Sequence, residues 1–339
     1  MLPAFLGLSG PVLTDAERAL IRGANPAGFI LFGRNVVDPA QLRALTDSLR
    51  DTSGRADLPI LIDQEGGRVA RLRPPHWPAF PAAGRFAALY DKAPMSAIEA
   101  VRANAQAIAL MLAEAGINVD CAPMVDVRQP DADAIMGDRA FGTEPMQVAA
   151  LGRAMLDGLK AGGVAGVIKH MPGHGRARAD SHHSLPLVDA PAEELATDIA
   201  PFRALAARAP MAMTAHILYP AWDADRPATL SPTIIGKVIR GEIGYDGLLM
   251  TDDIAMGALT APLPERARAA LDAGCDVVLH CTGEPADNEL LANALPAIGE
   301  AAAARLARAM AGTARPGAAD TGALIAKRDA LLAFADGTD

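Results

Sequence analysis

The sequence has few cysteines and no long apolar run, and both absences exclude classes of protein. Only three of its 339 residues are cysteine, and each stands in an apolar segment: Cys121, Cys275 and Cys281. We therefore expect buried free thiols in a reducing compartment and no structural disulfide. No segment approaches the roughly 20 apolar residues that a membrane-spanning helix needs. The apolar stretch near the N-terminus is too short for a signal peptide, so a cytoplasmic protein is expected.

Clustered positive charge is also missing. The net charge is −9 with a pI near 5.3, and the arginines are scattered along the chain. Nucleic acids and anionic membrane surfaces attract clustered lysine and arginine, so neither is expected as a partner. Hydrophobic residues make up 51% of the chain and charged residues 21%, which is enough apolar material for a large core. The composition therefore indicates a globular protein.

Short apolar segments recur along the chain, with segments of helical spacing between them. The expected strands are residues 4–10, 28–32, 58–63, 118–127, 163–170, 210–217, 247–254 and 275–281. Strands that are apolar on both faces are typical of a parallel sheet covered by helices, and eight strand-helix units in series close a (β/α)8 barrel. An open doubly wound sheet is the alternative, although no G-x-G-x-x-G motif follows the first strand. The sequence therefore predicts an α/β protein with a TIM barrel.

Capping residues and helical spacing locate the helices. Thr14 is expected to cap a helix over residues 15–23, Asp38 and Pro39 to open one over 40–50, and Ser96 to open one that ends at Gly116. Later helices are expected over residues 145–163, 191–209, 231–244, 264–274 and 287–312. We expect one catalytic barrel domain over residues 1–312, followed by a linker and a helical tail over 313–339.

Polar and reactive residues collect where the expected strands end. In a barrel of this type the active site lies at the carboxyl ends of the strands. The residues at these positions are Asp63, Lys169, His170, His216, Asp252 and Asp253, with Arg139 in the long loop after the fourth strand. Burying two carboxylates directly after an apolar run costs free energy unless they are ion-paired or have a functional role. This convergence predicts a functional site.

The segment KHMPGHGRARADSHH at residues 169–183 allows three interpretations. A metal site would use His170, His174 and one of His182 or His183. His170 and His174 are four residues apart, which would place them on one face of a helix, but the proline and glycines of the segment forbid a regular helix there. A phosphate site would need a glycine-rich turn that leads into a helix N-terminus, and here a polar loop follows. The third interpretation is an acid-base device.

Asp180 and His182 support the third interpretation. Because they are two residues apart, their side chains face the same way in an extended segment, and the carboxylate can hold one ring nitrogen while the other faces a substrate. Such a partner fixes the tautomer of an imidazole and stabilises its cationic form, which suits general acid and base catalysis. With Asp252 as nucleophile, the pair supplies the two functions of a retaining glycosidase.

Several motifs in this order resemble glycoside hydrolase family 3, in its single-domain branch of bacterial β-N-acetylhexosaminidases. They are ILIDQEGGRVARL, GDRAFG, GVIKHMPGHGRARADSHHSLP, MTAHILYP and GLLMTDDIAMGAL, and the likeness spans roughly residues 4–285. The resemblance implies an exo-acting β-N-acetylglucosaminidase of cell-wall recycling, which removes N-acetylglucosamine from muropeptide fragments or chitobiose-like substrates. It implies no metal and no cofactor, and a monomer or weak dimer.

The resemblance also implies residue roles. Asp252 is the implied nucleophile, His182 the acid and then the base, and Asp180 its partner, with His183 as the alternative acid. The implied sugar-binding residues are Asp63, Arg71, Arg139, Lys169, His170, His216 and Met256. The glycine- and arginine-rich loop that carries His182 is expected to close over bound sugar. A β-glycosidase of neutral sugars, a glycoside phosphorylase, a metal-dependent hydrolase and a non-catalytic sugar-binding barrel are the alternative functions.

Overall fold

The expected strands form one closed parallel barrel in the computed structural model, which describes residues 1–313 and 319–336. They are β1 (Leu2–Gly7), β2 (Pro26–Leu31), β3 (Ile60–Ile62), β4 (Val119–Asp120), β5 (Ala165–Met171), β6 (Met211–Thr214), β7 (Leu248–Asp253) and β8 (Val277–His280). Each strand pairs with the next, and β1 pairs with β8 to close the ring. The predicted TIM barrel is confirmed.

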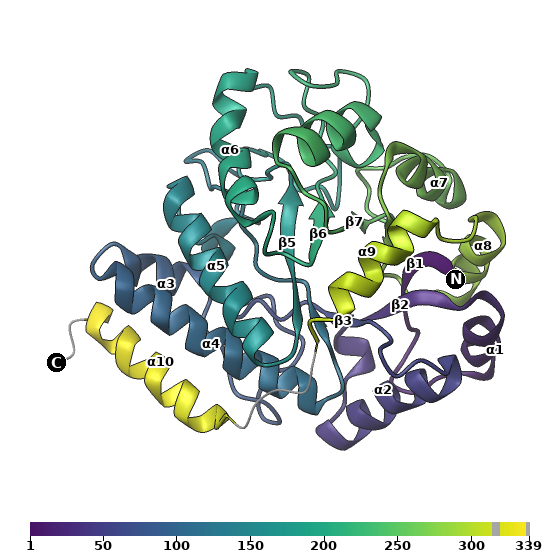
Figure 1. The fold of residues 1–339 in the computed structure, drawn as a ribbon, viewed down its shortest axis with the longest axis horizontal. Helices are drawn as coiled ribbons and strands as arrows, with labels where there is room; N and C mark the ends of the chain where they lie inside the picture. Colours follow the sequence, from purple (N-terminus) through teal and green to yellow (C-terminus); the bar gives the residue numbers. More distant parts are fainter. Residues whose placement is uncertain (314–318, 337–339) are drawn as a thin grey trace.

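Helices surround the barrel on its outside (Figure 1). They are α1 (Asp15–Ala24), α2 (Pro39–Ser53), α3 (Ala83–Tyr90), α4 (Pro94–Glu114), α5 (Pro145–Ala161), α6 (Ala192–Leu205), η4 (Ile234–Glu242), α7 (Leu263–Ala273), α8 (Pro285–Ala294), α9 (Glu300–Met310) and α10 (Thr321–Asp336). Short 3-10 turns lie at Gly33–Asn35 (η1), Gly137–Arg139 (η2) and Ala228–Leu230 (η3). Among the residues that the structure describes, none of these helices is both long and apolar enough to cross a membrane.

Two predicted helix starts are confirmed by their caps. The Thr14 hydroxyl accepts a hydrogen bond from the backbone N–H of Glu17 at 3.2 Å, while the Glu17 carboxylate accepts one from the backbone N–H of Thr14 at 2.7 Å. This reciprocal capping box satisfies two backbone donors that the helix leaves free. Asp38 caps α2 by accepting from the Gln41 N–H at 2.8 Å, with Pro39 in the first turn.

Two predicted helix boundaries are wrong. Ser96 does not open α4, which begins two residues earlier at Pro94, because a proline in the first turn has its φ already set for a helix. The segment 287–312 is two helices, α8 and α9, rather than one. Pro296 lies between them, and it cannot donate the backbone hydrogen bond that a continuous helix would need. The helix α3 was not expected at all.

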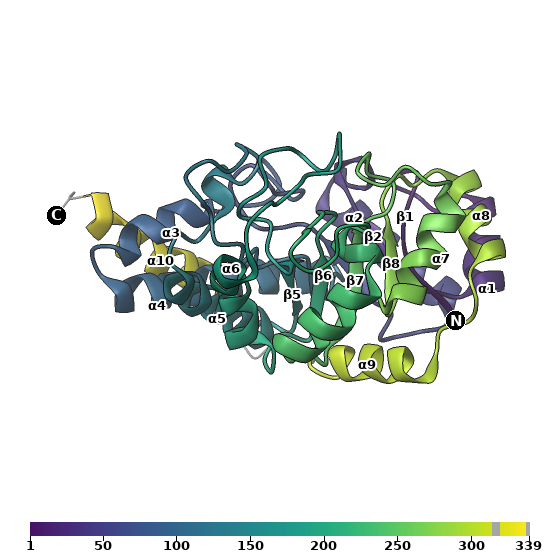
Figure 2. The same ribbon diagram turned by 90° about the horizontal axis from the view of Figure 1, so that it is seen from above.

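The helix α9 closes one end of the barrel. Leu306, Ala309 and Met310 pack into the same buried cluster as the side chains that point into the barrel, such as Phe5 and Leu61. The backbone N–H of Ile298, just before α9, donates to the carbonyl of Met1, so this is the end where the strands begin, and Figure 2 shows α9 there, beneath the strands. Among the described residues, α9 thus blocks the end where the strands begin, and a substrate is expected at the opposite end, where the strands finish.

The tail helix α10 lies along α4 and α3 (Figure 1). Its Arg328 side chain is 5% exposed, donates to the Asn104 side chain of α4 at 3.1 Å and lies over the Phe80 ring at 5.6 Å. A buried arginine with these partners fastens the helix to the barrel. The predicted helical tail is present; most of the predicted linker before it and the chain end after it lie outside the described residues, and the domain boundary at 312 stays a prediction.

Candidate active site

A pocket of about 350 Å³ opens where the strands end. The predicted site residues that line it are Asp63, Arg71, Arg139, Lys169, His170, His182, Asp252 and Met256. They come from β5, from β7 and from the segments that follow β3, β4, β5 and β7. The tertiary structure therefore brings together residues that lie as far apart in the sequence as Asp63 and Met256.

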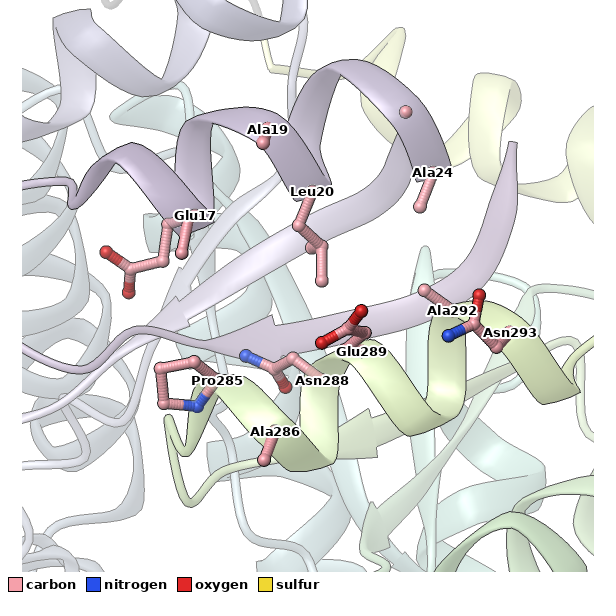
Figure 3. A pocket seen from close by; sticks show the side chains of 12 residues that line it. Glu17, Ala19, Leu20, Ala24, Pro285, Ala286, Asn288, Glu289, Ala292 and Asn293 are labelled. Carbon is pink, nitrogen blue, oxygen red and sulfur yellow. The ribbon is translucent and has the colours of Figure 1, made fainter.

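A larger hollow of about 640 Å³ lies between α1 and α8 and is lined by none of these residues (Figure 3). Half of its lining residues are alanine or glycine, and Glu17 and Asn288 are its buried polar groups. Both already have hydrogen-bond partners. The Glu17 carboxylate accepts hydrogen bonds from Ser9 and Thr14, and the Asn288 side-chain amide donates one to the Gly7 carbonyl. None of the predicted site residues lines this hollow, and the smaller pocket at the strand ends is the candidate site.

Five charged side chains form an ion-pair cluster on one wall of the pocket. Lys169, 3% exposed, lies 3.1 Å from Asp63 and 2.7 Å from Glu65. Arg71 contacts Asp63 at 2.9 Å, and Arg139 forks onto both oxygens of Glu65 at 2.8 and 2.9 Å. Burial alone would raise the pKa of Asp63 and Glu65, but the neighbouring cations outweigh it and hold both below their usual range. The cluster is a rigid array of charged donors and acceptors that suits the hydroxyl groups of a sugar.

His170 is oriented by a buried carboxylate, Asp126. The Nδ1 atom of His170 donates to Asp126 at 2.8 Å, and the backbone N–H groups of His170 and His174 donate to the same carboxylate. Burial would raise the pKa of Asp126, but His170 and these hydrogen bonds bring it below its usual range. The other ring nitrogen, Nε2, is thereby turned toward Asp252, 4.0 Å away. Asp126 acts through His170 and holds it in place.

Asp252 lies at the end of β7 with its side chain 18% exposed. One of its oxygens accepts from the backbone N–H of Asp253 at 2.8 Å. Burial would raise the pKa of Asp252, yet His170, His216 and that hydrogen bond outweigh it, so the carboxyl has a pKa below its usual range. Asp252 is therefore ionised at neutral pH and partly accessible from the pocket, as a nucleophilic carboxylate must be.

The Asp180 and His182 side chains meet as the spacing predicted. Asp180 accepts from His182 Nδ1 at 2.6 Å and from the His182 backbone N–H at 2.9 Å, so Nδ1 is occupied and Nε2 is the ring nitrogen that can serve a substrate; His182 lines the pocket. His183 lies 3.8 Å from the same carboxylate, is 84% exposed and does not line the pocket. The geometry therefore favours His182 over His183 as the oriented imidazole.

His216 lies behind the pocket rather than in its wall. Its side chain is fully buried; Nε2 donates to the carbonyl of Asp253 at 3.0 Å, and Nδ1 lies 2.7 Å from the Thr229 hydroxyl. Both ring nitrogens are committed, so His216 is not available to a sugar, and its predicted substrate-binding role needs correction. Burial lowers its pKa. Its observed role is to support the end of β7 through the hydrogen bond to the Asp253 carbonyl.

Two functional side chains were missed by the sequence analysis. Glu65 stands two residues after Asp63 in the motif DQEGG, and Asp126 ends the apolar run APMVD. The signal in both cases is a carboxylate next to an apolar segment, because a carboxylate that is buried there needs a partner of opposite charge or a hydrogen-bond donor. The sequence does not say which cation or histidine each would meet.

The metal and phosphate interpretations of the loop do not fit the observed positions. Within residues 1–313 and 319–336, no three His, Cys, Asp or Glu side chains are arranged to hold a metal ion. His170 and His174 instead pack edge to face, with ring centres 5.4 Å apart. After the loop the chain continues without a helix until α6 begins at Ala192, so the glycines do not lead directly into a helix N-terminus. The observed contact between Asp180 and His182 fits the acid-base interpretation.

Asp120, the last residue of β4, provides a pH-dependent test of the electrostatics near the cluster. It is fully buried; one oxygen accepts from the Gln64 N–H at 3.0 Å and the other has no partner among the described residues. Burial raises its pKa to about 7, from 3.8 for an ordinary aspartate. The folded state thus keeps a proton that the unfolded state releases, and this contribution to stability is lost as the pH rises through about 7.

We expect Asp120→Asn to become more stable relative to wild type as the pH rises. An amide cannot ionise, so the difference in melting temperature should shift in favour of the variant between pH 5.5 and 8.5, measured by thermal unfolding at several pH values. Asp47→Asn, at an exposed ion pair on α2, is the control. A difference for Asp120→Asn that stays constant over this range would show that the buried carboxyl does not titrate there.

These features define the class of the protein: a barrel enzyme with a glycoside hydrolase site, in which a carboxylate, a carboxylate-held histidine and a wall of charged donors and acceptors share one pocket. The family description Glycosyl hydrolase family 3 N terminal domain matches residues 8–311. The chain belongs to this family.

Known relatives agree with this assignment. A protein named Beta-hexosaminidase from Alkalilimnicola ehrlichii is 43% identical over 283 residues, which cover 82% of this chain and 80% of the relative. Another from Bordetella avium is 36% identical over 293 residues, covering 85% and 83%. The solved structure of NagZ from Neisseria gonorrhoeae in complex with N-trifluoroacetyl-D-glucosamine has a TM-score of 0.85 at 30% identity and covers 99% of this chain and 97% of that one. The predicted resemblance to the β-N-acetylhexosaminidases of the family is confirmed.

Proposed function

We propose that this protein is a retaining exo-β-N-acetylglucosaminidase that removes terminal N-acetylglucosamine from peptidoglycan fragments in the cytoplasm. The observation that carries the proposal is the presence of Asp252 and the dyad histidine His182 in the wall of the same pocket. The choice of an N-acetylated sugar is supported by the names of the relatives and by the N-acylated glucosamine bound to the Neisseria gonorrhoeae protein.

In the first step of the proposed mechanism, Asp252 attacks the anomeric carbon. The bond from that carbon to the leaving oxygen breaks, and the oxygen takes the proton from Nε2 of His182. Asp180 holds Nδ1 at 2.6 Å and so keeps the ring in the orientation needed for the transfer. The product of this step is a covalent ester between the sugar and Asp252.

In the second step, His182 acts as the base. Its neutral Nε2 takes a proton from a water molecule, whose oxygen attacks the anomeric carbon and releases the Asp252 carboxylate. Two inversions at the same carbon leave its configuration unchanged. Asp63, Arg71, Arg139, Lys169, His170 and Met256 hold the sugar in this proposal. The charged members need no rearrangement to do so because their ion pairs already fix them.

A comparison of substrates tests the proposal. We expect the wild-type protein to hydrolyse a 4-nitrophenyl β-N-acetylglucosaminide in buffer that contains a chelator, and to act on the matched β-glucoside at least about a hundredfold more slowly, because polar groups built for the acetamido group are left unpaired by a hydroxyl. Product analysis in phosphate buffer would reveal a sugar phosphate if the protein were a phosphorylase. Equal rates on both glycosides, or loss of activity on chelation, would contradict the proposal.

A further inference from the structure

The loop that carries Asp180 and His182 is held very differently at its base and at its tip. At the base, the Tyr219 hydroxyl donates to the carbonyl of Gly173 at 2.7 Å, and Arg176 pairs with Asp198 of α6 at 2.6 Å. The tip, residues 180–183, has two backbone hydrogen bonds to the turn after β7. Gly257 N–H donates to the His182 carbonyl at 3.1 Å, and Ala258 N–H donates to the Ser181 carbonyl at 3.2 Å.

Ser181 points into the protein while its neighbours point outward. Ser181 as a whole is 3% exposed, whereas the side chains of Asp180 and His182 are 25% and 58% exposed. The Ser181 hydroxyl lies 3.4 Å from Nε2 of His174, which is itself buried. The burial of Ser181 thus fixes which way the two flanking side chains face. We call Gly257, Ala258 and His174 together the loop seat.

Gly257 is needed in the loop seat for space and not for its backbone conformation. Its φ is not in the left-handed region, and the residue is exposed. A Cβ atom added there would lie 2.9 Å from the carbonyl oxygens of both His182 and His183, which is too close for backbone atoms that cannot rotate away. Any side chain at Gly257 therefore has to displace the tip of the loop.

The loop seat also lies close in sequence to the proposed nucleophile. Gly257 follows Asp252 by five residues, and the backbone N–H of Met256, between them, donates to the carbonyl of Asp253 at 3.1 Å. One short turn therefore relates the position of the Asp252 carboxylate to the position of the imidazole.

We infer that Gly257 is a positioning residue for the acid and base of the reaction: its lack of a side chain lets the turn after β7 seat the loop tip so that His182 faces Asp252 across the pocket. The inference rests on the proposed function, because it takes His182 to be the proton donor. It predicts a defect in proton transfer with little change in sugar binding.

The test compares Gly257→Ala with wild type on two β-N-acetylglucosaminides. The 2,4-dinitrophenolate group of the first substrate can leave without help from an acid. The methoxy group of the second, a methyl glycoside, has to be protonated before it can leave. We expect kcat on the methyl glycoside to fall by about tenfold or more, a part of the range typical for loss of a general acid, while the bond-breaking step on the dinitrophenyl glycoside and KM for both change less than about threefold. Pre-steady-state release of dinitrophenol reports that step without the later attack by water.

Matched variants separate positioning from a general structural effect. Gly33→Ala places a methyl group on an exposed glycine at the same end of the barrel with nothing within 4 Å, and should behave as wild type. Ser181→Ala removes only the hydroxyl toward His174 and should give a smaller defect of the same kind as Gly257→Ala. Equal loss on both substrates, or no loss in Gly257→Ala, would overturn the inference while the proposed function stood. A wild type inactive on both would overturn the proposed function and this inference with it.

Discussion

Asp252→Asn should lower kcat/KM for a chromogenic β-N-acetylglucosaminide at least about a thousandfold, which corresponds to on the order of 4 kcal/mol of barrier. An amide of the same shape keeps the hydrogen bond from the Asp253 N–H but carries no negative charge for attack on the anomeric carbon. Initial rates of wild type and variant, measured side by side with a chelator present, provide the test.

The pH profile of the wild type supplies a second check on the same residue. Because burial is outweighed by His170, His216 and the Asp253 N–H, which hold the pKa of Asp252 below the usual value for aspartate, the acid limb of the profile should fall at a lower pH than an ordinary aspartate would give. Thermal unfolding of the variant controls for a folding defect. A variant that folds and keeps more than about a tenth of the wild-type rate would exclude Asp252 as the nucleophile.

His182→Ala should lower kcat by about a hundredfold to ten-thousandfold on a substrate with a poor leaving group, whereas His183→Ala should lower it less than about threefold. The two histidines are adjacent, yet only His182 has Nδ1 held by Asp180 at 2.6 Å and lines the pocket. Steady-state rates of both variants on the methyl glycoside and the dinitrophenyl glycoside give the comparison.

His183→Ala is a close control for His182→Ala. Both side chains are largely exposed, so neither substitution removes packing from the core. Added azide, which attacks an ester intermediate without a base, should restore part of the rate of His182→Ala on the dinitrophenyl glycoside. If His183→Ala were the damaged variant, the loop would have to turn its other histidine into the pocket when sugar binds, and the dyad described for the free protein would not be the catalytic one.

Much of the fold could be predicted because it follows from local patterns. All eight strands lie within or close to the predicted apolar segments, since a strand covered on both faces has to be apolar throughout. The Thr14 and Asp38 caps depend on residues three apart, which a sequence displays directly. The helix break at Pro296 could also have been predicted from the sequence, although one continuous helix was expected over residues 287–312.

The site could be predicted in its residue types and in part of its geometry. The pairing of Asp180 with His182 is local, so their spacing was enough to predict it. His216 was wrongly expected in the pocket, because its position near the end of β6 does not reveal that Asp253 and Thr229 occupy both ring nitrogens. The partners of Glu65 and Asp126 come from β5 and from the turn at Arg139, and each lies more than 40 residues away in sequence.

The amino-acid sequence by itself determined the barrel, the end of it where polar side chains collect and the contact between Asp180 and His182, since each depends on periodicity or on spacing within a few residues. Only the tertiary structure decided which charges pair, that His182 rather than His183 faces the pocket, and that the turn at Gly257 seats the loop. These depend on contacts between distant segments, where a difference of one ångström separates a hydrogen bond from none, and no local pattern encodes such distances.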